Sequence, residues 1–128
     1  MPREIVLLAP VPPGTLALVE AGAAVDPELT LRSLHEGGVH QVVRSDPDDP
    51  APEAGTAVLS LSQPRRVDGP DEVRRLLPVL TALPGWTAEP FWWVDAVAPW
   101  GDAGRAGLAV AQEMATRLGG VCVVQDGE

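Results

Sequence analysis

The sequence predicts a single α+β domain, with a mixed or antiparallel sheet of about five strands and helices packed mainly on one face of it. Three observations lead to this fold class. The 128 residues fit one domain with one hydrophobic core. Short apolar runs typical of strands alternate with stretches whose apolar residues recur at helical spacing. Proline, glycine and acidic residues mark the breaks between them. We therefore treat residues 1–128 as one domain.

The first quarter of the chain predicts one strand and two helices. Residues 4–9 form a short apolar run that a proline-rich segment closes, as expected for a buried strand. A helix capped by Thr15 is predicted over residues 15–25. A second helix is predicted from Asp26, a capping residue followed by Pro27, to His35, where two glycines follow.

The next part of the chain predicts a hairpin. Residues 39–45 are rich in valine, and residues 56–63 alternate between two faces, so both predict strands. Residues 46–55 between them combine prolines with acidic residues. This composition is typical of a flexible, solvated loop rather than of regular structure.

The second half predicts two more helices and two more strands. A helix is predicted within residues 70–85, and Pro78 must bend or end it. Residues 91–97 predict a strand, and Asp102 can cap a helix that ends at a pair of glycines. Residues 121–125 form the last short apolar strand.

The charge of the chain is strongly negative, with 18 acidic and 9 basic residues and a formal net charge of −9. This balance disfavours direct nucleic-acid binding and permits a basic protein partner. Four of the basic residues form one cluster in the sequence, Arg65, Arg66, Arg74 and Arg75. Acidic residues lie beside them, so we expect these arginines to form salt bridges. No apolar run approaches the roughly 20 residues of a membrane span, and the N-terminal run is too short for a signal peptide. We expect a cytoplasmic protein that does not associate with membranes, and a homo-oligomer is compatible with the sequence.

The aromatic residues are concentrated in one segment. All five lie within fifteen positions: Trp86, Phe91, Trp92, Trp93 and Trp100. On a strand, Phe91, Trp93 and Asp95 share one face and Trp92 shares the other with Val94. If helices cover one face alone, Trp92 or Trp93 is exposed, and exposed tryptophan is enriched at protein interfaces. The alternatives are that these rings fill the core or line a pocket for a small molecule.

Side chains for catalysis or metal binding are not found at a recognised spacing. His35 and His40 lie on either side of a helix-to-strand break and have no third ligand. Burial among valines should raise the pKa of Cys122 and make it unreactive. The acidic residues of the 46–55 loop lack the spacing of a calcium-binding loop. We predict no catalytic residue, no metal site and no cofactor.

The C-terminal stretch AVAQEMATRLGGVCVVQD contains Ala109, Ala111 and Ala115, then Leu118-Gly119-Gly120, and Asp126. It resembles the closing helix and strand of several small actinobacterial proteins, some of which are immunity proteins of bacterial toxin systems. The resemblance implies a small acidic protein that binds a toxin and blocks its active site.

The favoured hypothesis from the sequence is a non-enzymatic protein-binding module, such as an immunity or accessory protein, that binds a basic partner. The partner would contact the aromatic segment and acidic surface, namely Trp86, Phe91, Trp92, Trp93, Asp95, Trp100, Asp46, Asp48 and Asp49. The alternative is a small-molecule-binding protein or an enzyme with a tryptophan-lined pocket.

Overall fold

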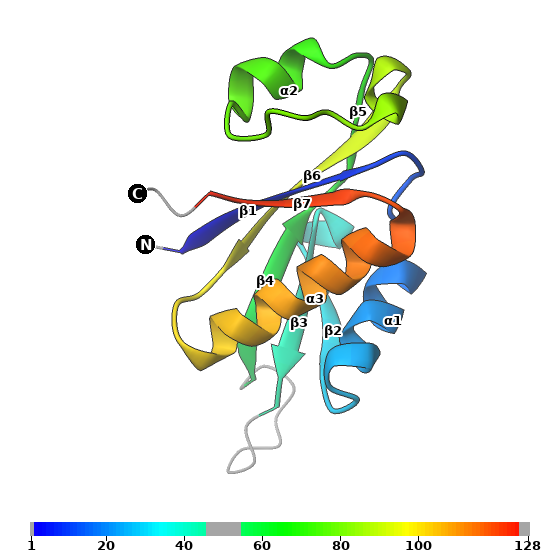
Figure 1. Ribbon diagram of the computed structural model, residues 1–128. Coiled ribbons are helices and arrows are strands. Elements are labelled where there is room, and N and C mark those ends of the chain that lie inside the picture. The colour runs from blue at the N-terminus through cyan, green and yellow to red at the C-terminus, as the bar shows by residue number, and fades with distance from the viewer. Residues whose placement is uncertain (1, 46–54, 126–128) are drawn as a thin grey trace.

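A computed structural model describes residues 2–45 and 55–125, which contain seven strands and three α-helices (Figure 1). The strands are β1 (Arg3–Ala9), β2 (Thr30–Leu34), β3 (Val39–Arg44), β4 (Thr56–Ser62), β5 (Arg65–Val67), β6 (Phe91–Ala98) and β7 (Val121–Gln125). The helices are α1 (Thr15–Val25), α2 (Asp71–Leu76) and α3 (Asp102–Leu118), with short 3₁₀ turns η1 (His35–Gly37) and η3 (Gly85–Ala88). Residues 46–54 of the predicted acidic loop, with Asp46, Asp48 and Asp49, lie outside the described residues.

All paired strands run antiparallel in one sheet of order β2-β3-β4-β6-β1-β7, and β5 pairs with β6. The predicted α+β class is therefore confirmed. The sheet has two strands more than the five predicted, because β2 and β5 were not expected. In the described part of the chain, no helix is both long enough and apolar enough to cross a membrane.

The helix predicted from Asp26 to His35 is wrong, because this segment contains β2. Oδ1 of Asp26 accepts a hydrogen bond of 2.9 Å from the backbone N–H of Glu28, which closes a local turn instead of opening a helix. The chain then extends and pairs with β3 from Thr30↔Val43 to Leu34↔Val39. His35 lies in the hairpin turn, where it and Glu36 have positive φ angles of 52° and 56°.

Helices α1 and α3 cover one face of the sheet (Figure 1). Their buried side chains, including Leu18, Val110 and Met114, pack with Ile5 and Leu59 of the strands. Arg117 of α3 forms an ion pair of 3.3 Å with Glu20 of α1 at the surface. The residues between these helices and the sheet form the larger of the two hydrophobic cores.

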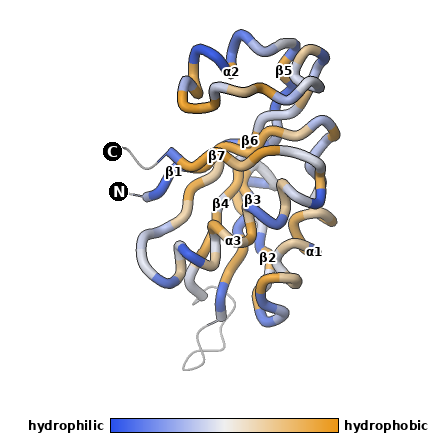
Figure 2. Tube along the Cα trace, viewed as in Figure 1, coloured by the Kyte–Doolittle hydropathy of each residue, from blue (hydrophilic) through white to orange (hydrophobic). Residues whose placement is uncertain are grey.

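The segment from β5 through α2 and η3 covers the opposite face over β1, β6 and β7 (Figure 1). Helix α2 ends at Leu76, in agreement with the prediction that Pro78 ends it. Val73 of α2 and Leu77, the residue that follows the helix, pack with Leu8 of β1. Hydrophobic residues are concentrated along the central strands between the two covering layers (Figure 2). The central strands are therefore buried on both faces, although the two longer helices lie together on one.

Candidate functional site

A bulge interrupts the sheet where the chain passes from β4 to β5. Leu61 pairs with Ala96 and Arg65 pairs with Trp93. Three residues, 62–64, therefore lie opposite two residues of β6, 94–95, which is one residue more on the β4–β5 side. Pro64 has no N–H to donate to the sheet. An extra residue of this kind bends the strand, and such bulges are over-represented next to functional sites.

A cavity of about 360 Å³ lies beside this bulge, on the face that α1 and α3 cover. It is formed by the β1–α1 loop, the start of α1, β3, the β4–β5 bulge, β6 and α3. The lining residues are Pro12, Pro13, Gly14, Thr15, Leu18, His40, Leu61, Ser62, Gln63, Pro64, Trp92, Val94 and Met114. The volume is within the range of small-molecule sites, about 300–1,000 Å³. We call this cavity the Trp92 cavity.

The polar side chains of the Trp92 cavity are few and are held by neighbouring residues. His40 on β3 is half-buried, and its Nδ1 lies 2.8 Å from Oγ of Ser33 on β2. This contact leaves Nε2 as the ring nitrogen available to a ligand. The side-chain amide of Gln63 donates a hydrogen bond to the backbone oxygen of Gly37 in the hairpin turn. Thr15 and Ser62 add two hydroxyl groups that can donate or accept.

The Trp92 cavity is nearly free of ionisable groups. Among the described residues that line it there is no Asp, Glu or Arg, and His40 is the titratable side chain. The chain as a whole has 18 acidic residues. A buried charge requires an opposite charge or hydrogen bonds, so a lining without carboxylates does not suit a cationic ligand, whereas His40 and the hydroxyl groups can donate hydrogen bonds to an anionic one.

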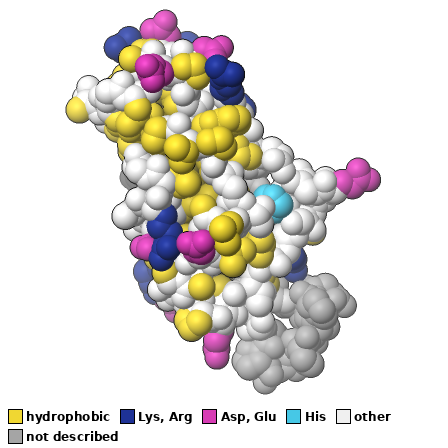
Figure 3. Space-filling model, turned by 90° about the vertical axis from the view of Figure 1, so that its right-hand side faces the viewer, with side chains coloured by type: hydrophobic (Ala, Val, Ile, Leu, Met, Phe, Trp, Pro, Cys, Tyr) yellow, Lys and Arg dark blue, Asp and Glu magenta, His cyan; other side chains and the backbone are white. Residues whose placement is uncertain are grey.

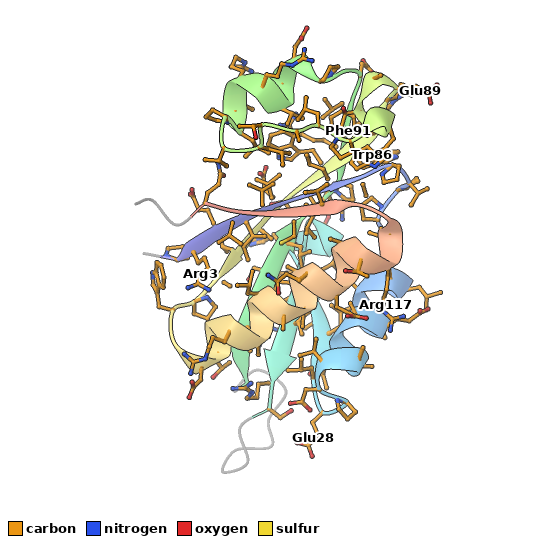
Figure 4. The ribbon with its side chains drawn as sticks, in the orientation of Figure 1. Arg3, Glu28, Trp86, Glu89, Phe91 and Arg117 are labelled. Atoms are coloured by element: carbon orange, nitrogen blue, oxygen red, sulfur yellow. The ribbon has the colours of Figure 1, made fainter. Side chains whose placement is uncertain are left out.

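The structure places the predicted aromatic residues in three different environments. Phe91 and Trp93 are buried in the core beneath α2, where the Trp86 and Phe91 rings form a T-shaped pair with centroids 5.7 Å apart (Figure 4). Trp92 points to the opposite face and lines the Trp92 cavity. Trp100 is 51% exposed, and the guanidinium group of Arg3 lies 4.7 Å from its ring centroid.

The aromatic segment is therefore not one exposed surface. Phe91 and Trp93 cannot contact a partner in this structure because the segment containing α2 covers them. The exposed carboxylate of Asp95 accepts a hydrogen bond of 2.9 Å from the indole N–H of Trp93. Arg65 stacks on the Trp93 ring, 4.7 Å from its centroid. The contacts of Trp93 with Asp95 and Arg65 therefore stabilise the fold.

The remaining ionisable groups have structural explanations. Burial raises the pKa of the half-buried Cys122 thiol to about 11, as the sequence predicted, so it is protonated at neutral pH. The predicted salt bridges of the arginine cluster are also confirmed. Glu72 pairs with Arg75 at 2.9 Å and with Arg65 at 3.3 Å, and the hydrogen bond from Arg75 lowers the pKa of Glu72. Arg66 pairs with Asp68 and Arg74 with Asp71.

Sequence reasoning found Trp92 but not the residues that surround it. The sequence shows no sign of a shared site for His40, Leu61, Gln63 and Thr15, because the cavity gathers residues from distant segments. The one local signal is Pro64, which interrupts the strand pattern.

No three His, Cys, Asp or Glu side chains gather at a metal-binding spacing within residues 2–45 and 55–125. Comparison with models of protein families, with curated proteins and with solved structures finds no match to this chain. Function is thus inferred from the geometry of the Trp92 cavity and of the surface around it.

Proposed function

We propose that the protein binds a small organic molecule in the Trp92 cavity. The observation that supports this proposal is the cavity itself, a hollow of about 360 Å³ with mainly apolar walls and a few polar groups. This combination is typical of sites for small molecules. The bulge at residues 62–64 supports it further, because bulges re-aim side chains and are over-represented next to active sites.

The lining residues have two roles in this proposal. Trp92, Leu61 and Val94 remove the apolar part of the ligand from water, which contributes roughly 25 cal/mol for each Å² buried. His40, Ser62 and Thr15 supply the hydrogen bonds that orient its polar part. We propose that these residues bind the ligand without catalysing a reaction on it.

Trp92→Ala is expected to weaken ligand binding by about thirtyfold, which corresponds to about 2 kcal/mol of lost apolar contact. Small organic acids, alcohols and aromatic compounds would be screened for a saturable rise in melting temperature, since a ligand stabilises the folded state that binds it. The control is Trp100→Ala, which removes an indole that does not line the cavity. Equal binding by wild type and Trp92→Ala, or no saturable effect with any compound, would contradict the proposal.

A second proposed function is the one favoured by the sequence, a protein-binding module such as an immunity or accessory protein. Apolar side chains are exposed on the β1–α1 loop and on α1, namely Val11, Leu16 and Val19. Figure 3, which views the molecule from the right-hand side of Figure 1, shows hydrophobic side chains gathered mainly over the upper half of this side. Exposed apolar patches commonly mark interaction sites, and the net charge of −9 favours a basic partner. A cytoplasmic location belongs to the same proposal and is supported by the single cysteine.

Leu16→Ser is expected to weaken binding to such a partner at least tenfold, because Leu16 is 70% exposed and would lose its apolar contact. Binding would be measured by calorimetry against the purified product of the neighbouring gene. Val79→Ser is the matched control, since Val79 is 71% exposed but follows α2 on the other side of the sheet. An unchanged affinity for Leu16→Ser, or an equal loss for Val79→Ser, would exclude this surface.

A further inference from the structure

A second cavity of about 290 Å³ lies between α1 and strands β2 and β3. Its lining is apolar apart from one threonine and comprises Leu18, Val19, Gly22, Leu29, Thr30, Leu31 and Val42. We call it the α1 cavity. The buried Leu18 lines both this cavity and the Trp92 cavity.

The α1 cavity lies where α1 faces strands β2 and β3. Gly22 is buried in the middle of α1 and has no side chain to fill the space towards β3. A Cβ atom built at Gly22 would lie 3.9 Å from Cγ1 of Val42, which is an ordinary contact distance. Leu18, which lines both cavities, and Gly22, which lines the α1 cavity alone, lie one helical turn apart on the buried face of α1.

The two cavities differ in the ligand groups that they can accept. The Trp92 cavity offers His40 and hydroxyl groups, which can donate hydrogen bonds to a polar head. The α1 cavity offers almost exclusively hydrocarbon, where a polar group would lose its hydrogen bonds to water. Acidic side chains are absent from the described lining of both, so a cationic head would find no carboxylate partner.

We infer that the ligand is an elongated amphiphile with a straight aliphatic tail and an uncharged or anionic head that accepts hydrogen bonds. The head lies in the Trp92 cavity beside His40, and the tail passes Leu18 and enters the α1 cavity. Leu18 admits the tail by changing its rotamer. This inference rests on the proposed small-molecule function and specifies the class of ligand.

Binding of hexanoate, octanoate and decanoate, measured by calorimetry below their micelle concentrations, tests the tail. Each methylene group that enters an apolar cavity should strengthen binding roughly fourfold. We therefore expect decanoate to bind at least tenfold more tightly than hexanoate. Decylamine has the same tail with a cationic head and should bind at least tenfold more weakly than decanoate. Equal affinities across the carboxylates, or tighter binding of decylamine, would overturn the inference.

Two variants of α1 locate the tail. Gly22→Leu fills the α1 cavity and should abolish the advantage of decanoate while leaving hexanoate affinity within twofold of wild type. Leu18→Ala joins the cavities and should strengthen decanoate binding several-fold. Ala23→Leu, on the exposed side of α1, is the control for a larger side chain in this helix. If decanoate keeps its full advantage in Gly22→Leu, the tail does not occupy the α1 cavity and the inference fails.

The carboxylate series separates this inference from the proposed function. Binding that depends on Trp92 but not on chain length would contradict the amphiphile while leaving a small-molecule site in place. If no compound binds in a Trp92-dependent manner, the proposed function itself fails. Loss of folding in Gly22→Leu is detected by circular dichroism, and the wild-type carboxylate series and Leu18→Ala still decide the question.

Discussion

Phe91→Ala should lower the free energy of unfolding by about 4 kcal/mol, the middle of the range for deletion of a buried phenylalanine ring. Phe91 is fully buried at the start of β6, in the core that α2 and its flanking loops form with the sheet. Its ring also forms the T-shaped pair with Trp86 on η3. The substitution would leave a cavity between the sheet and this covering segment, which has only a six-residue helix to stabilise it.

Urea denaturation would give the loss of stability, and hydrogen exchange would locate it. The expected pattern is faster exchange in α2 than in α3, because the covering segment should open before the rest of the molecule. Val79→Ala is the control, since this side chain is 71% exposed and its truncation should change stability by less than about 0.5 kcal/mol. A loss below about 1 kcal/mol for Phe91→Ala would mean that the covering segment does not depend on the ring.

The sequence predicted the elements whose patterns are local. The apolar runs at 4–9 and 91–97 correspond to β1 and β6, and the helix that begins at Asp102 corresponds to α3. Strand β2 was missed because Asp26 and Pro27 form a local helix-start signal, whereas the strand is stabilised by pairing with β3. Strand β5 was missed because it has only three residues, which follow a proline and are too few to show the alternation of apolar and polar residues that predicts a strand.

The candidate site was less predictable than the fold. The strand period showed correctly that Trp92 and Trp93 lie on opposite faces, but it could not show which face would be covered. The answer depends on the segment from β5 to η3, whose packing on the sheet is a tertiary property. The neighbours of Trp92 in its cavity include His40, and these two residues are more than fifty positions apart in the chain.

Gly107→Ala should lower the free energy of unfolding by about 3 kcal/mol, although alanine ordinarily stabilises a helix interior by up to about 1 kcal/mol relative to glycine. Gly107 lies where α3 crosses β4, and a Cβ atom there would overlap the carbonyl oxygen of Val58. It would also lie 2.7 Å from the carbonyl carbon of Val58 and 3.3 Å from Cβ of Ala98. Backbone atoms of a central strand cannot move aside as a flexible side chain can, so α3 would have to shift away from the sheet.

Gly22→Ala is the matched comparison, because it makes the same change in α1 with no overlap. Its Cβ would lie at the ordinary distance of 3.9 Å from Val42, so stability should stay the same or rise by up to about 1 kcal/mol. Urea denaturation of both variants tests for these opposite signs, and equal effects would show that Gly107 does not set the spacing of α3 and β4. A shift of α3 would also move Met114, which lines the Trp92 cavity two turns further along. Gly107→Ala should therefore weaken ligand binding as well as stability, whereas Gly22→Ala should leave the Trp92 cavity intact.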